Sequence, residues 1–151
     1  FDGEGVTEKI KTTGNTNGIA FTKALQTRDF EGLAFVNLVD FDMLYGHRRD
    51  VAGYAAAATE FDKFVADFIP GMREGDILMV TADHGCDPSY TKTTDHTREY
   101  VPYLIYGKGI KPGVDLGTHL CFGTIAQTIC EYLGVDASSL DGKSVWNEIK
   151  A

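Results

Sequence analysis

The chain has 151 residues, of which 43% are hydrophobic, which is enough for one well-formed core and short for two. Its 14 basic and 22 acidic residues give a formal net charge of −8, which disfavours binding to nucleic acid and to anionic membranes. No apolar run approaches the length of about 18 residues that a membrane-spanning helix requires, so we expect no membrane association. The three cysteines show no paired spacing, which favours a reducing, cytoplasmic location.

Strands and helices are predicted to alternate along the chain. Runs of apolar residues of strand length indicate strands that are covered on both faces, and apolar residues spaced three and four apart indicate amphipathic helices. Pro70-Gly71 is expected to stop the central helix, and Pro102 favours the first residues or an edge of a strand. The predicted elements are a helix at 18–27, a strand at 33–40, a helix at 50–72, a strand at 76–83, a strand from Tyr100 and a helix at 122–134.

This order predicts an α/β fold with a mostly parallel sheet and helices on both of its faces. The length favours a single domain over residues 1–151. The sequence begins at Phe1 inside a loop-like stretch, so we also expect it to be part of a longer protein.

Aspartate and histidine occur together at the predicted strand ends. Asp83 and His84 follow the second strand, and Asp95 and His96 lie on the loop that enters the third. Asp40 and Asp42 end the first strand and precede His47. Functional groups gather at the carboxyl ends of strands in open α/β sheets, and mixed carboxylate and imidazole ligands suit Zn²⁺, Mn²⁺ or Fe²⁺. The pattern therefore predicts a transition-metal site.

A structural role is the alternative for each of these residues taken singly, because aspartate before a helix is a common cap. His119 has no adjacent carboxylate and is expected to lie outside the site. Asp40 and Asp42 share the same strand parity, so both could face the metal, and spacing alone does not choose between them.

Three sequence stretches resemble the phosphopentomutase family of the alkaline phosphatase superfamily. They are "TADHG", "DFDMLYGHRRD" and "TDHTREYVPYLIYGKGIK". The first is shared by much of the superfamily, and the other two are more selective. The resemblance implies an alkaline-phosphatase-like core, of which this chain is the later part, without the N-terminal part and the cap domain.

The resemblance also implies two divalent cations, expected to be Mn²⁺. One is bound by Asp42, His47 and His96, which favours Asp42 over Asp40, and the other by Asp83 and His84. A nucleophilic threonine and another aspartate ligand are expected upstream of Phe1, so no catalytic nucleophile is assigned in this chain and we expect it to be inactive alone.

The implied reaction interconverts ribose or deoxyribose 1-phosphate and 5-phosphate through a phosphothreonine enzyme. Arg48 and Arg98 stand beside ligand histidines and are candidates to bind the phosphate of the sugar, although either arginine could instead hold a loop. The rival readings are another metalloenzyme of the superfamily, such as a cofactor-independent phosphoglycerate mutase, a phosphatase or a sulfatase, and a metal-binding or structural module that is not an enzyme.

Overall fold

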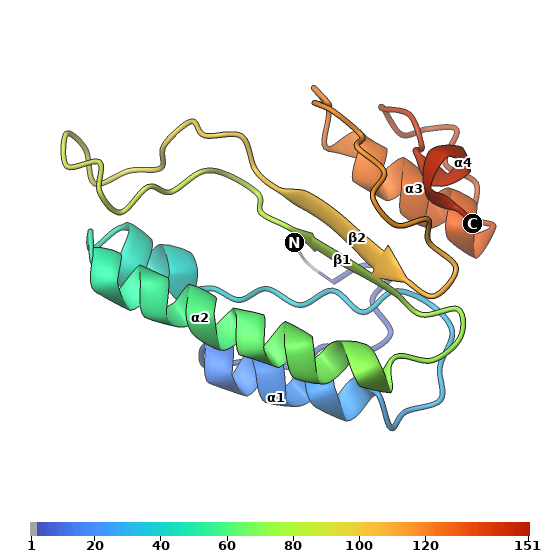
Figure 1. Cartoon of the computed structure of the whole chain (residues 1–151), viewed down its shortest axis with the longest axis horizontal. Helices are drawn as coiled ribbons and strands as arrows, with labels where there is room; N and C mark the ends of the chain where they lie inside the picture. The colour runs from blue at the N-terminus through green and yellow to red at the C-terminus, as the bar shows by residue number, and fades with distance from the viewer. Residues whose placement is uncertain (1–2) are drawn as a thin grey trace. The chain divides into compact units, whose positions relative to one another are not determined.

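The alanine-rich stretch before Pro70 forms the longest helix of the computed structural model, which describes residues 3–151. This helix, α2 (Val51–Phe68), begins where the side chain of Asp50 accepts a hydrogen bond from the Gly53 N–H at 2.9 Å (Figure 1). A short 3₁₀ turn, η2 (Ile69–Gly71), ends it at the proline, because proline cannot continue the helical hydrogen bonding. The predicted central helix is therefore confirmed.

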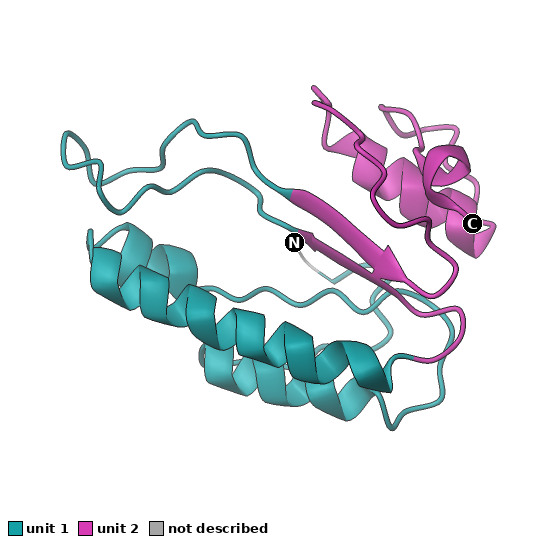
Figure 2. Ribbon diagram, in the orientation of Figure 1, with its two compact units in different colours: residues 1–72, 81–102 teal, residues 73–80, 103–151 magenta. Residues whose placement is uncertain are grey.

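The chain divides into two compact units (Figure 2). Unit 1 comprises residues 1–72 and 81–102, and unit 2 comprises residues 73–80 and 103–151. The single domain expected over residues 1–151 stays a prediction.

In unit 1, helix α1 (Asn15–Leu25) begins three residues before the predicted start at Gly18. The reason is a pair of hydrogen bonds between its first residue and Asp40. The Asn15 N–H donates to Asp40 Oδ2 at 2.7 Å, and the Asp40 N–H donates to Asn15 Oδ1 at 3.0 Å. Asp40 therefore satisfies an otherwise unpaired N–H at the helix start, which is a structural role.

The stretch 33–40 was predicted to be a strand, and this prediction is wrong for the structure. Residues 33–38 pair with no strand in the part of the chain that the structure describes. Phe35 is 84% exposed and Leu33 is 61% exposed, so the apolar run is not covered on both faces as expected. A strand forms only when a neighbouring backbone accepts and donates its hydrogen bonds, and no such neighbour lies within residues 3–151.

Two strands form the sheet within the described residues, β1 (Ile77–Thr81) and β2 (Tyr103–Gly107). Their arrows point in opposite directions in Figure 1, and an isolated antiparallel bridge between Gly85 and Thr97 continues the pairing. This pair differs from the mostly parallel sheet predicted above. Parallel neighbours need a crossover, usually a helix, whereas a loop without a helix joins β1 to β2. Helices on both faces of the sheet stay a prediction.

In unit 2, helix α3 (Gly123–Leu133) ends at Gly134, as the sequence predicts, and the φ of Gly134 is 67°, the left-handed conformation that glycine favours. Its Thr128 hydroxyl donates to Thr124 O and accepts from the Val145 N–H, just before the short helix α4 (Trp146–Ile149). Val145 is only 1% exposed, so this contact lies in the core of the unit. The fold is α/β, and no helix within residues 3–151 has the length and apolar character needed to cross a bilayer.

Candidate metal centre

Asp42 lies on a short π-helix, η1 (Phe41–Gly46), and His47 follows directly after it. The His47 N–H donates to the Asp42 carbonyl at 2.9 Å, an i→i+5 bond. Residues five apart in an α-helix would point about 140° away from each other. The wider π turn instead places the two side chains on the same side, and such turns recur at functional sites. Their five-residue spacing was the only sequence signal for this turn.

An aromatic cluster holds η1 against α2. The Phe41 ring packs edge-on against Tyr54, with ring centroids 5.3 Å apart, and against Phe61 at 6.4 Å. At the other end, Gly46 is buried so closely against Cys86 that a Cβ atom there would lie 2.5 Å from the Cys86 sulfur. The position of the π-helix is thus fixed at both ends by packing.

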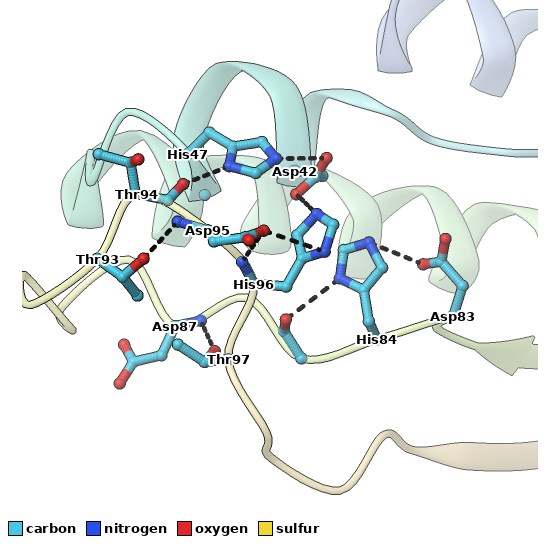
Figure 3. A network of polar contacts seen from close by, with 12 residues as sticks. Asp42, His47, Asp83, His84, Asp87, Thr93, Thr94, Asp95, His96 and Thr97 are labelled. Carbon is cyan, nitrogen blue, oxygen red and sulfur yellow. Dashed lines mark hydrogen bonds and ion pairs between the residues drawn. The ribbon is translucent and has the colours of Figure 1, made fainter.

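Asp42, His84 and His96 come together from three separate segments of unit 1 (Figure 3). One ligand atom of each lies within 4.8 Å of the others. The rings of His84 and His96 stack with centroids 3.6 Å apart, and the His47 ring is 4.9 Å from that of His96. Four of the five residues predicted as metal ligands therefore lie side by side.

The carboxylate of Asp42 is at the centre of this group. Its Oδ2 lies 3.4 Å from His47 Nε2, and its Oδ1 lies 3.6 Å from His96 Nε2. Oδ1 is buried and has no hydrogen-bond donor among the described residues. Ligand atoms that share an ion with bonds of about 2.0–2.2 Å are about 3.0–3.5 Å apart, so these separations fit a bound cation.

Backbone carbonyl groups set the orientation of two of the imidazoles. His47 Nδ1 lies 2.6 Å from Thr94 O, and His84 Nδ1 lies 3.2 Å from Gly85 O. A carbonyl oxygen only accepts, so each Nδ1 carries a proton, and in the neutral tautomer with that proton Nε2 is the nitrogen that can bind a metal. Metal-binding histidines are commonly oriented in this way by a partner on the second nitrogen.

Asp83 is less closely associated with the group. Its side chain is 84% exposed, and its Oδ1 lies 3.7 Å from His84 Nε2, on the side of that ring away from Asp42 (Figure 3). The structure brings His84 to Asp42 and His96, whereas the resemblance pairs it with Asp83 at a second cation. The division of the ligands between two cations stays a prediction.

Arg49, rather than Arg48, holds the surrounding loops. Its guanidinium donates to the carbonyl oxygens of Gly46, Asp87, Thr93 and Asp95, at distances of 2.5–3.1 Å. Arg48 and Arg98 are exposed and have no recorded hydrogen bond or ion pair within residues 3–151. The sequence placed all three arginines near the histidines but gave no signal that Arg49 would differ.

Several neighbouring groups have shifted pKa values. Burial raises the pKa of the Cys86 thiol, and the Asp42 carboxylate raises it further, first through a side-chain hydrogen bond and then through its charge, so Cys86 stays a neutral thiol. The pKa of Asp95 is lowered by a hydrogen bond from the His96 N–H and then by the charge of His96.

His119 lies outside the cluster. It belongs to unit 2, and its ring contacts Leu116 O at 3.0 Å.

Comparison with known proteins decides the family. The sequence model of the Metalloenzyme superfamily matches residues 2–137. The chain belongs to the Metalloenzyme superfamily. This membership agrees with the alkaline-phosphatase-like core expected from the sequence, and mixed carboxylate and histidine ligands are what a metalloenzyme of this kind would need.

The chain is also similar to proteins named phosphopentomutase. It is 51% identical to that of Acetivibrio thermocellus over 149 residues, which are 99% of this chain and 38% of the relative. It is 53% identical to that of Lachnoclostridium phytofermentans over 148 residues, 98% of the chain and 37% of the relative. It is 47% identical to that of Carboxydothermus hydrogenoformans over 150 residues, which are 99% of this chain and 38% of the relative. The chain thus spans little more than a third of the length of these relatives.

Proposed function

We propose that Asp42, His47, His84 and His96 bind a divalent cation, with Mn²⁺ as the native ion. The observation that carries the proposal is the buried Asp42 Oδ1, which has no hydrogen-bond donor among the described residues although two imidazoles lie beside it. A buried carboxylate oxygen without a partner is costly, and a cation would remove that cost. Oxygen and imidazole ligands together favour a transition metal. Asp83 would join His84 in binding a second cation.

When bound, such ions neutralise the charge of a phosphoryl group and lower the pKa of a coordinated hydroxyl. This chain's own residues would then orient the substrate. Arg48 and Arg98 have exposed guanidinium groups with no recorded partner within residues 3–151, and each could grip phosphate through two N–H groups. Since the net charge is −8, these local positive groups are needed to attract an anionic substrate.

The reaction that we propose for the whole protein is that of a phosphopentomutase, the interconversion of ribose or deoxyribose 1-phosphate and 5-phosphate, as a step of nucleotide metabolism. Support comes from relatives of that name, which are 47–53% identical over nearly the whole chain. The substrate would be a small sugar phosphate. We propose a cytoplasmic location, for which the free thiols of Cys86, Cys121 and Cys130 are the support.

A chimeric enzyme tests this proposal. The matching segment of the Acetivibrio thermocellus relative is replaced by this chain, with which it is 51% identical over 149 residues. We expect the chimera to convert ribose 1-phosphate to ribose 5-phosphate with Mn²⁺, and to lose that activity when the cation is removed by a chelator. A folded chimera that hydrolyses p-nitrophenyl phosphate but does not move phosphate between the two positions of ribose would favour the rival phosphatase function.

A further inference from the structure

The side chain of Arg49 uses all five of its N–H groups on backbone carbonyl oxygens. Nε and Nη2 donate to Thr93 O at 3.0 and 2.5 Å, and Nη2 also donates to Asp95 O at 2.6 Å. Nη1 donates to Gly46 O at 3.1 Å and to Asp87 O at 3.0 Å. Arginine has no further donor, so this guanidinium is not available to bind phosphate.

These carbonyl groups belong to the segments that carry the candidate ligands. Gly46 precedes His47, Asp87 follows His84 by three residues, and Thr93 and Asp95 flank the carbonyl that contacts His47. The carbonyl oxygens of Thr93, Thr94 and Asp95 are therefore all directed at the turn between Gly46 and Arg49. One side chain ties together the three segments that meet at the site.

Apart from the bonds of Arg49 and the contact of His47 Nδ1 with Thr94 O, the hydrogen bonds of backbone groups in the loop between His84 and His96 are made within residues 84–97. Its residues form turns and bends, apart from the single bridge between Gly85 and Thr97. Thr97 adds one hydrogen bond, because its hydroxyl accepts from the Asp87 N–H at 2.7 Å. A loop of this kind keeps one conformation only when side chains satisfy its carbonyl groups.

The backbone of Arg49 is itself unusual. Its φ is 56°, and it is the one residue other than glycine with a positive φ within residues 3–151. Side chains with a Cβ atom disfavour this conformation, which suits glycine better. The backbone conformation of Arg49 is therefore unfavourable for an arginine, and the five hydrogen bonds of its side chain offset that cost.

We propose that Arg49 is a positioning residue that holds the loop bearing His96, and the segment bearing His84, against the turn bearing His47. Only the expected effect of Arg49 on cation binding rests on the metal site proposed above. The effect of Arg49 on the conformational order of residues 86–98 can be measured without any cation.

Hydrogen exchange and Co²⁺ binding test the proposal on the purified chain. Arg49→Ala should speed exchange of the amides in residues 86–98 at least tenfold and weaken Co²⁺ binding at least tenfold, with an altered visible absorption of bound Co²⁺. Exchange within α2 should not change. Arg49→Lys should recover only part of either effect, because an ammonium group cannot reach carbonyl groups on three segments at once.

Two matched variants separate the side chain from its surroundings. Lys92→Ala removes a charge from the same loop, at a side chain with no recorded contact within residues 3–151, and should match the wild type. Arg49→Gly removes the unfavourable positive φ of a residue with a Cβ atom, but it also removes the guanidinium group, so this variant should behave like Arg49→Ala. The proposal is overturned if Arg49→Gly behaves like the wild type, or if Arg49→Ala leaves exchange in residues 86–98 unchanged. A wild-type chain that binds no Co²⁺ would contradict the metal site, and exchange alone would then decide the role of Arg49.

Discussion

Oδ1 of Asp42 lies 3.6 Å from Nε2 of His96, and the carboxylate oxygen is buried without a hydrogen-bond donor among the described residues. The separation is longer than a hydrogen bond. A carboxylate oxygen and an imidazole nitrogen, which are both ligand types for divalent cations, thus face each other across a gap of the size that a metal ion bridges. The predictions below follow from this relationship and from the packing around it.

Asp42→Asn should raise the stability of the metal-free chain, because it removes the charge of a partly buried carboxylate, whose Oδ1 has no donor among the described residues, and supplies an N–H donor beside the histidines. We expect the free energy of unfolding in the presence of a chelator to rise by about 1 kcal/mol. Urea unfolding monitored by circular dichroism measures it. Asp83→Asn is the control, since that side chain is 84% exposed and its loss should change little. A less stable Asp42→Asn chain would mean that the carboxylate has a partner that this account has missed.

His96→Ala and His47→Ala should abolish turnover in the chimeric enzyme, because each removes a candidate ligand. His119→Ala should leave turnover nearly unchanged, since His119 lies outside the cluster and its ring contacts the Leu116 carbonyl of its own loop. The assay follows conversion of ribose 1-phosphate to ribose 5-phosphate. Equal losses in all three variants would indicate damage to folding rather than to the site.

Gly46→Ala should destabilise the chain by about 1–3 kcal/mol. The added Cβ would lie 2.5 Å from the Cys86 sulfur and 2.9 Å from Phe41 O, so η1 would have to shift. Thermal unfolding of the single variant and of the double variant Gly46→Ala, Cys86→Ala measures the effect. The second substitution removes the sulfur contact and should restore part of the loss. If Gly46→Ala is as stable as the wild type, the close packing of η1 on Cys86 is wrong.

Asp136 provides a pH-dependent contribution to stability outside the metal centre. The Ser138 N–H and then the Ser138 hydroxyl lower the pKa of its carboxyl group below the ordinary value of 3.8. A carboxyl group whose pKa is lower in the folded state stabilises the fold above the unfolded pKa, and this contribution is lost as the pH falls through the folded pKa. Asp136→Asn should therefore be less stable than the wild type at pH 6, and the two should converge below pH 3.8.

Urea unfolding across that pH range follows the difference between the two chains. A difference that stays constant down to pH 2 would show that the charge of Asp136 is not its cause.

The parts of the fold that the sequence predicted well are those determined by local patterns. The central helix, its stop at Pro70 and the end of α3 at Gly134 each depend on residues within a few positions of one another. The stretch 33–40 was predicted wrongly, because its apolar character resembles a buried strand while pairing depends on a distant neighbour. The opposed directions of β1 and β2 likewise depend on how the loop between them folds.

The candidate site also has parts that the sequence predicted and parts that it did not. The aspartate and histidine residues at the predicted strand ends include Asp42, His84 and His96, which lie together in the structure. Strand parity did not decide whether Asp40 is a metal ligand. The structure shows that Asp40 is hydrogen-bonded to Asn15 at the start of α1. The five hydrogen bonds of Arg49 depend on carbonyl groups, which no residue type reveals.

Titration of the purified chain with Mn²⁺, followed by isothermal calorimetry, tests the central claim most directly. We predict that the wild type binds the ion and that Asp42→Ala, His84→Ala and His96→Ala each weaken binding about tenfold or more, as expected for the loss of one ligand of a shared ion. His119→Ala should bind as the wild type does. Unchanged Mn²⁺ affinity in the three ligand variants would contradict the assignment of this cluster as a metal centre.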